Sequence, residues 1–387
     1  MDIKNKRLIS VDIARGIVMI IMACDHVSFF WNSGRVAEEG LRGHIPHYLN
    51  IFQMLTRIIS HFTPTSFIWL AGFMVALSAF RKSRDNLSET SISKYLTLRG
   101  LLIIFLQISV VNFGFMAISF LSLNLRSIFF MDVLWTIGMG LIILAWLRLL
   151  GKKILLVILF LNFMVFPLFY EELLLFSSKN DFLLSLGIIS FAPIASGKAH
   201  INCLYPIIPW LGVMLFGYLS GSWFKDITGA IDGEKIFKKC INWGLGLLSV
   251  FFFLRFFNGY GNWIKWDKLT FQDFFTISKY PPSLVYLLFT LGLMFLVFAI
   301  ALKIEKSGYS GRQPVKMIIA FGRVPLFFYC VHLLLYGAIP VLLGICQKGG
   351  LIKVYLIWFV GLLILYKPCI WYYNYKKSHR DSFFRYI

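Results

Sequence analysis

Apolar stretches of about 20 residues alternate with short polar segments along almost the whole chain. A helix needs roughly 20 apolar residues to cross the hydrocarbon core of a bilayer. Only helices and closed barrels satisfy their backbone in lipid, and no series of alternating ten-residue strands is present. The pattern predicts an all-α, polytopic membrane bundle of about ten transmembrane helices. The expected spans are residues 8–33, 61–80, 99–121, 131–149, 153–170, 204–224, 240–257, 282–303, 317–346 and 351–373.

Composition agrees with a membrane protein. Hydrophobic residues make up 58% of the chain and charged residues 14%, whereas soluble domains contain about 25% charged residues. The first apolar stretch lacks a small-residue cleavage site, so we interpret it as a spanning helix rather than a signal peptide. We expect one domain over residues 1–387. The six cysteines are scattered without paired spacing, which predicts packing roles and no disulfide framework or metal site.

The positive charges indicate a topology. The formal net charge is +20, and Lys and Arg are about twice as frequent in the termini and even-numbered loops as in the odd-numbered loops. Positively charged loops remain in the cytoplasm, so both termini are expected there. Insertion and anionic lipid account for the basic charge, so nucleic acid is not an expected partner.

The first span, Leu8 to Trp31, carries most of the chemistry: VDIARGIVMIIMACDHVSFFW holds Asp12, Arg15, Asp25 and His26. Ionisable residues inside a span are costly and usually face a cavity or a partner. The eleven residues from Arg15 to His26 place both on one helix face, ~16 Å apart along the axis. The inner Arg15, paired with Asp12, suits an anion, and the outer His26 suits proton transfer near neutral pH. A polar cap at the end of the span is the alternative for Asp25 and His26.

The ninth span repeats the order of an inner arginine and an outer histidine. Arg323 and His332 lie at depths similar to those of the first pair, but about 180° apart on a regular helix unless Pro325 kinks it. Tyr329 shares a face with His332, and both are candidates to bind an acceptor or orient the first histidine. The alternatives are an arginine that snorkels to the membrane interface, for Arg323, and a hydrogen-bonded core histidine, for His332. Trp210 is a further candidate for the outer mouth of a cavity.

The string from Asp12 through Arg15 to Asp25 and His26 resembles the opening helix of the heparan-alpha-glucosaminide N-acetyltransferase-like family, and its spacing is similar to that of acyltransferase family 3 proteins. Three further stretches resemble the first family: HFTPTSFIWLAGFMVALS (His61 to Ser78), IPWLGVMLFGYLSG (Ile208 to Gly221) and FGRVPLFFYCVHL (Phe321 to Leu333). The resemblance therefore extends along the chain. It implies transfer of an acyl group, usually acetyl from cytosolic acetyl-CoA, to a sugar amine or hydroxyl across the membrane.

The resemblance implies a role for each candidate. His26 is the expected catalytic base or acyl carrier, oriented by Asp25 or by a residue of another helix. Donor-binding residues are Arg15, Asp12 and Arg323; acceptor-binding residues are His332, Tyr329 and Trp210. In the animal lysosomal enzyme the catalytic histidine lies further past the arginine, which makes His44 and His47 the weaker alternatives to His26.

The expected partners are thus acyl-CoA, a sugar or glycan and the lipid bilayer. No metal is expected, and a homo-oligomer is compatible with the sequence. A bacterial inner membrane is the expected location. The rival hypothesis is a transporter or flippase that uses the intramembrane Asp, Arg and His residues as a relay. A non-enzymatic membrane protein with structurally paired charges is the third.

Overall fold

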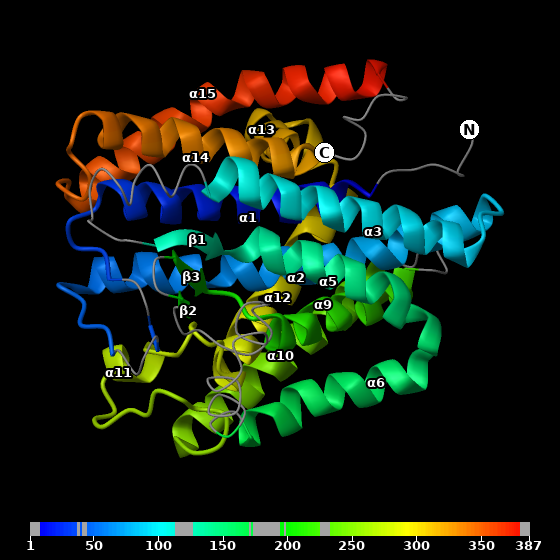
Figure 1. Cartoon of the computed structure of the whole chain (residues 1–387), viewed down its shortest axis with the longest axis horizontal. Coiled ribbons are helices and arrows are strands. Elements are labelled where there is room, and N and C mark those ends of the chain that lie inside the picture. Colours follow the sequence, from blue (N-terminus) through cyan, green and yellow to red (C-terminus); the bar gives the residue numbers. More distant parts are fainter. Residues whose placement is uncertain are drawn as a thin grey trace.

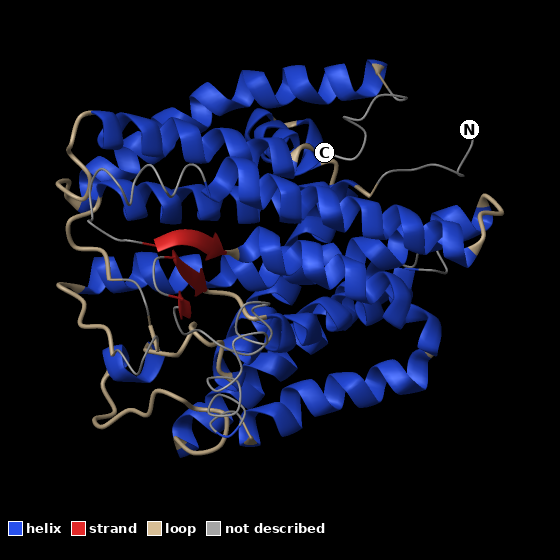
Figure 2. Cartoon of the chain, in the orientation of Figure 1, coloured by secondary structure: helices blue, strands red, loops and turns tan. Residues whose placement is uncertain are grey.

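The computed structural model describes residues 8–36, 39–40, 45–112, 127–169, 172, 194–196, 199–224 and 233–379. Helices dominate this part of the chain, and three short strands lie at one end of the bundle (Figure 2). The all-α membrane fold predicted from the apolar pattern is confirmed. The long helices are α1 (Ile9–Trp31), α2 (Ile51–Arg84), α3 (Glu89–Leu106), α5 (Val133–Leu147), α9 (Ile207–Gly221), α10 (Gly233–Phe257), α12 (Leu284–Lys306), α13 (Gln313–Arg323), α14 (Pro325–Leu342) and α15 (Leu351–Ser378).

Eight helices in the described part of the chain are long and apolar enough to cross a membrane. Helix α9 is apolar but shorter, with 15 residues. The span expected at residues 153–170 is α6 (Lys152–Phe160), continued by a π turn (Leu161–Val165) and a 3-10 turn (Phe166–Leu168). The expected number of about ten spans therefore corresponds to eight long helices and these two shorter or interrupted segments.

Helix α1 lies in the middle of the bundle and contacts α2, α12, α13, α14 and α15. The start of α1 and the end of α15 lie towards the same end of the molecule, away from the strands (Figure 1). At the strand end, Asn32 after α1 forms a β-bridge with Gly349 before α15. His26 lies close to that end of α1, whereas Arg15 lies close to the other end.

A small sheet covers part of the strand end. Its order is β1 (Ser127–Met131), β3 (Ala199–Cys203), β2 (Ile194–Ser196), with β1 parallel and β2 antiparallel to β3. The apolar pattern did not predict these strands. Gln107 and Asn112, at the end of the third span, hold β1: the amide of Gln107 donates to the carbonyl of Phe130, and the Asn112 side chain accepts from the Phe130 N–H.

Several helix boundaries differ from the expected spans: α3 begins at Glu89 and not near residue 99, and α10 begins at Gly233 and not near residue 240. Helix α2 begins at Ile51 and not near residue 61, because the Asn50 side chain accepts a hydrogen bond from the Gln53 N–H at 3.0 Å and caps the helix. The ninth span is divided at Val324 into α13 and α14. Pro325 has no N–H to continue the first helix, but suits the first turn of the second.

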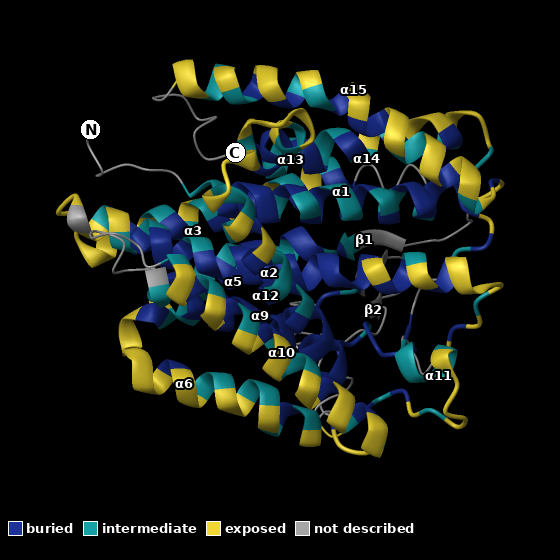
Figure 3. Cartoon of the chain, turned by 180° about the vertical axis from the view of Figure 1, so that it is seen from behind, coloured by how far each residue is buried: buried dark blue, intermediate teal, exposed yellow. Residues whose placement is uncertain are grey.

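The outer faces are apolar and the centre contains polar side chains. Exposed residues cover α6 and the outer face of α15, while α1, α2 and α12 are mostly buried (Figure 3). Exposed Phe and Leu side chains on such faces fit a lipid environment. Hydroxyl groups join the inner helices, as where Thr290 donates to Thr65 at 2.9 Å.

Candidate active site

The two histidines of the first and ninth spans are in direct contact. Nδ1 of His26 on α1 lies 2.6 Å from Nε2 of His332 on α14, and the rings stack with centroids 4.9 Å apart and planes inclined by 23°. His332 is fully buried, whereas His26 remains partly exposed. The fold thus joins two predicted site residues that are 306 positions apart.

The hydrogen-bond chain determines which nitrogen of His26 is free. Nδ1 of His332 lies 2.9 Å from the carbonyl oxygen of Phe328, which can only accept, so this Nδ1 carries the hydrogen. Nε2 of the neutral His332 must then accept from Nδ1–H of His26. Nε2 of His26 is left with its lone pair and makes no hydrogen bond to the described residues. This nitrogen is the one suited to take a proton.

Tyr329 and Asp132 extend the site toward the sheet. The Tyr329 ring meets the His26 ring edge-on, with centroids 6.0 Å apart and an interplanar angle of 86°. The tyrosine hydroxyl donates to Oδ2 of Asp132 at 3.4 Å, at the residue that precedes α5. Burial raises the pKa of Asp132, and the backbone hydrogen bond of Val133 and the charge of Lys279 offset this only in part.

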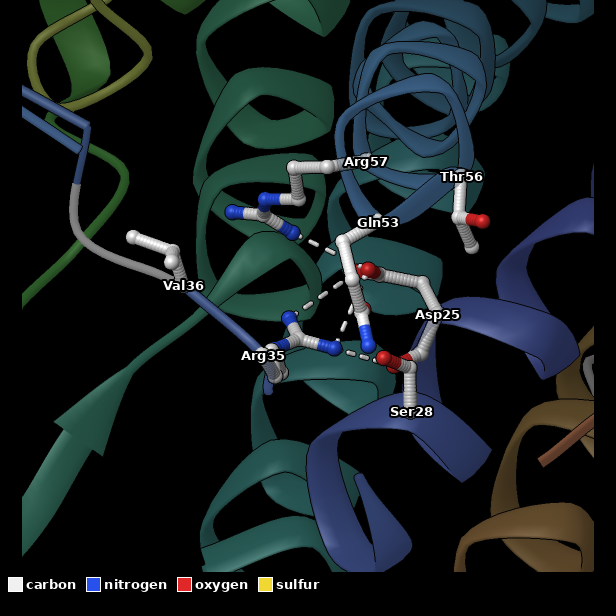
Figure 4. A pocket seen from close by; sticks show the side chains of 7 residues that line it. All are labelled: Asp25, Ser28, Arg35, Val36, Gln53, Thr56 and Arg57. Atoms are coloured by element: carbon white, nitrogen blue, oxygen red, sulfur yellow. Dashed lines mark hydrogen bonds and ion pairs between the residues drawn. The ribbon is translucent and has the colours of Figure 1, made fainter. Parts of the chain in front are cut away.

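Asp25 forms ion pairs with two arginines rather than with His26. Its Oδ1 lies 2.9 Å from Nη1 of Arg57 on α2 and 3.1 Å from Nη1 of Arg35 after α1. The two guanidinium groups approach the carboxylate from different sides (Figure 4). The residue that contacts the His26 ring nitrogen is His332, so the expected orienting residue lies on another helix.

A small, partly open pocket lies beside Asp25. Most of its walls are polar (Figure 4). The polar residues that line it are Asp25, Ser28, Arg35, Gln53, Thr56 and Arg57. Its lining includes Asp25, the residue before His26, but neither histidine of the pair.

A buried glutamate completes the ionic network. Nε of Arg57 donates to Oε1 of Glu39 at 2.5 Å and Nη2 donates to Oε2 at 2.8 Å, while Nε2 of His61 lies 3.3 Å from Oε1. Burial raises the pKa of Glu39, but the charge and hydrogen bond of Arg57 outweigh it and hold this pKa well below its usual range. His61 is buried in this network.

Replacing Glu39 with Gln is expected to lower the free energy of unfolding by about 3 kcal/mol at pH 7, because Arg57 keeps its buried charge but loses one carboxylate. The folded-state pKa of Glu39 is depressed, so its contribution is complete above the ordinary value of 4.5 and is lost as the pH falls through the depressed value. Thermal unfolding in detergent should show a constant difference between E39Q and wild type from pH 7 to about 5, and a smaller one below 4.5.

Glu234→Gln is the matched control for this measurement. Its carboxylate pairs with Lys306 at 3.3 Å on an exposed surface, where an ion pair contributes at most about 1 kcal/mol. A difference between E39Q and wild type that matched this control, or that widened below pH 4.5, would contradict a stabilising role for the buried carboxylate.

The predicted donor-binding residues also meet, at the other end of α1. Oδ1 of Asp12 lies 3.9 Å from Nη1 of Arg15, and Oδ2 lies 3.8 Å from Nε of Arg323 on α13. Nη1 of Arg15 donates to the Gly322 carbonyl at 3.0 Å. A Cβ at Gly322 would lie 1.8 Å from the Asp12 carbonyl oxygen, so glycine is needed for this close approach of α13 to α1. Two guanidinium groups therefore share one carboxylate.

Trp210 occupies a position unlike the expected one. It is fully buried, and its ring lies 5.3 Å from Tyr205 and 6.3 Å from Tyr286. The indole therefore packs against the Tyr205 ring and does not line the outer opening of a cavity. Among the alternative histidines, His47 is exposed in the loop before α2, and His44 lies outside the described residues.

Sequence reasoning missed four charged residues of this region: Arg35, Glu39, Arg57 and Lys279. The expected topology puts each of them in an external loop, where charged residues are common. One signal was available for Arg57: a cap at Asn50 followed by apolar residues on one face indicates that α2 starts early enough to include it.

A family model described as heparan-alpha-glucosaminide N-acetyltransferase, catalytic, matches residues 7–256 of the 387-residue chain. The chain belongs to this family. It is accordingly a membrane acetyltransferase in the general sense. No curated protein matches the chain.

The matched region of the acetyltransferase family includes His26, Asp25 and Arg15 but ends before Arg323 and His332. The structure brings these last two residues onto the matched part, one at each end of α1. The roles of all five residues stay predictions.

Proposed function

We propose that the protein transfers an acetyl group from acetyl-CoA to an amine or hydroxyl of a sugar on the opposite side of the membrane. The observation that supports this most strongly is the His26–His332 contact, which leaves one imidazole nitrogen of a partly exposed residue free to take a proton. Membership of the acetyltransferase family agrees with this chemistry. The acyl-CoA donor, the sugar acceptor and the two-sided arrangement belong to the proposal.

In the proposed reaction, the acceptor nitrogen or oxygen attacks the thioester carbonyl carbon while Nε2 of His26 takes the acceptor proton. His332 stabilises the resulting imidazolium through the Nδ1–H of His26, as the third group of a catalytic triad does. The tetrahedral intermediate then expels the CoA thiolate, which accepts the proton from His26. The pantetheine arm would run along α1, since ~16 Å separates Arg15 from His26 along the axis.

The proposed location is a bacterial inner membrane with both termini in the cytoplasm. The distribution of Lys and Arg supports this orientation. In it, the Arg15–Asp12–Arg323 cluster lies on the cytoplasmic side, where acyl-CoA is made, and the histidine pair lies on the other side.

Release of CoA thiol by the purified protein tests the function. In detergent or liposomes, acetyl-CoA with an amino sugar should give CoA and the acetylated sugar in equal amounts. A transporter or flippase would move substrate without breaking the thioester, so the absence of thiol release would overturn the proposed function.

Arg15→Ala is expected to weaken acetyl-CoA binding by about tenfold to a hundredfold, the usual loss for a charged hydrogen-bonding pair. Arg15→Lys should restore binding only in part, because lysine keeps the charge but not the bidentate fork. Calorimetric titration with a non-hydrolysable acetyl-CoA analogue measures the change. Arg312→Ala, an exposed residue next to α13, is the control and should bind like wild type. Equal affinity of Arg15→Ala and wild type would contradict the assignment of the donor site.

A further inference from the structure

Lys279 is a buried cation in the loop between α11 (Phe271–Phe275) and α12, with 3% of its surface exposed. Its backbone N–H donates to the carbonyl of Glu39 at 3.1 Å, as does that of Tyr280 at 3.0 Å. Gly40, the residue after Glu39, has a φ of +84°, and a Cβ there would lie 1.9 Å from the Ser278 hydroxyl oxygen. The backbone around the lysine is therefore held tightly against the segment after α1.

Arg255 on α10 holds the segment that connects α10 to α12, which includes α11. This arginine is fully buried and its hydrogen bonds go to loop oxygen atoms. The acceptors are the carbonyls of Ile264, Asp273, Phe274 and Thr276 and the side chain of Asn262. A loop held in this way keeps Lys279 in one position, as a site residue requires.

The Lys279 ammonium differs from the other buried cations near His26. It lies 5.0 Å from the centre of the Tyr280 ring and 5.9 Å from that of Tyr205, and no carboxylate within the described residues forms an ion pair with it. Arg57, by contrast, is paired with Asp25. Desolvating an ammonium is costly, and contacts with aromatic rings compensate for only part of this cost. An anionic oxygen is the group that the ammonium lacks.

Contacts lead from His26 to this ammonium along one side of the site. The His26 ring touches Tyr329, whose hydroxyl donates to Asp132 in front of α5. One turn later on α5, the Thr136 hydroxyl donates to the carbonyl of Tyr205 at 2.5 Å. The Tyr205 ring is one of the two rings against the ammonium.

A second series of contacts connects Asp25, the residue before His26, to Lys279. Asp25 pairs with Arg57, and Arg57 pairs with Glu39, whose carbonyl accepts the Lys279 N–H. The charge of Lys279 interacts with Asp25, His26 and Asp132, which come from both series. The ammonium is therefore close enough to Asp25, His26 and Asp132 for its charge to act on all three.

We propose that Lys279 is a catalytic residue whose ammonium donates a hydrogen bond to the thioester carbonyl oxygen during acetyl transfer, an inference that rests on the proposed function. As the acceptor attacks the carbonyl carbon, the electron pair of the C=O bond moves to oxygen, and the acceptor proton moves to His26. The oxyanion is held by the Lys279 N–H until the C–S bond breaks, the C=O bond re-forms and the CoA thiolate takes the proton from His26. Fixed donors in a water-poor site are effective in such a role.

Lys279→Met tests the inference, because methionine fills a similar volume without a charge. The value of kcat should fall by about a hundredfold or more with every acceptor, including water, while acetyl-CoA binding stays unchanged. The midpoint of thermal unfolding should be equal to or above that of wild type, since a buried charge is removed. Lys279→Arg should recover part of the activity. Lys265→Met, at an exposed position between α10 and α11, is the control and should behave as wild type.

Three results would overturn this inference. A K279M variant that binds acetyl-CoA and transfers acetyl within about threefold of wild type would show that the ammonium is not used at the oxyanion. A loss confined to acceptors that carry a carboxylate, with neutral amino sugars and water unaffected, would assign Lys279 to recognition of substrate charge. Wild-type protein that releases no CoA would overturn the proposed function and this inference together.

Discussion

His26→Ala is expected to reduce acetyl transfer by at least about a hundredfold, the lower range for a general base. The reason is the hydrogen-bond chain from the Phe328 carbonyl through His332, which leaves Nε2 of His26 as the free base. Initial rates of CoA release at saturating acetyl-CoA and amino sugar measure this effect. Acetyl-CoA binding should stay near the wild-type value, because the donor residues lie about three helical turns away.

Two further histidine variants make this test specific. His47→Ala, at an exposed position, should leave the rate within about threefold of wild type. His332→Phe keeps a ring against Tyr329 but removes the acceptor for Nδ1–H of His26, so it should lose at least about tenfold in rate while remaining folded. If His47 proved indispensable and His26 did not, the base would lie in the loop after α1 instead.

Transfer is expected only when acetyl-CoA and the acceptor are supplied on opposite sides of a sealed membrane. The prediction follows from α1, which carries the Arg15 cluster near one end and the His26–His332 pair near the other. Arginine suits the phosphates of CoA because it binds oxygen anions bidentately. A bilayer core about 30 Å thick excludes both reagents, so each should reach the site from one face.

Proteoliposomes of known orientation make this measurement possible. With acetyl-CoA on the side of the termini and an impermeant amino sugar on the other side, CoA should be released at the full rate. Exchanging the two reagents should reduce release to background, and adding a pore-forming peptide should restore it. Full rates in sealed vesicles with both reagents on one side would rule out transfer across the membrane.

The sequence alone determined the membrane environment, the helical class and the chemistry of α1. These properties are local. The apolar length of a segment sets whether it spans a bilayer, and a step of eleven residues sets the common face of Arg15 and His26 whatever surrounds the helix. The family resemblance carried by the strings around His26 and His61 was confirmed by the match over residues 7–256.

Helix boundaries were determined only in part by the sequence. The first turns of α2 were not predicted because they contain polar residues such as Gln53 and Arg57. Prediction from apolar stretches places polar residues in water-exposed loops. In this fold Arg57 is buried against Glu39 and Asp25 inside the bundle. Pro325 indicated a kink, but that the helix divides completely at Val324 is a property of the folded chain.

The partners of the site residues were decided by the tertiary structure. No local rule shows that His26 meets His332, that Asp25 binds Arg35 and Arg57, or that Trp210 is buried. Each of these facts depends on which faces of distant helices pack together. Gly322 is an example, because its lack of a side chain lets α13 pack closely against α1. Lys279 is the clearest case. In the sequence it is one of several lysines in an external loop, and only the packing of that loop against Glu39 and Tyr205 buries its charge.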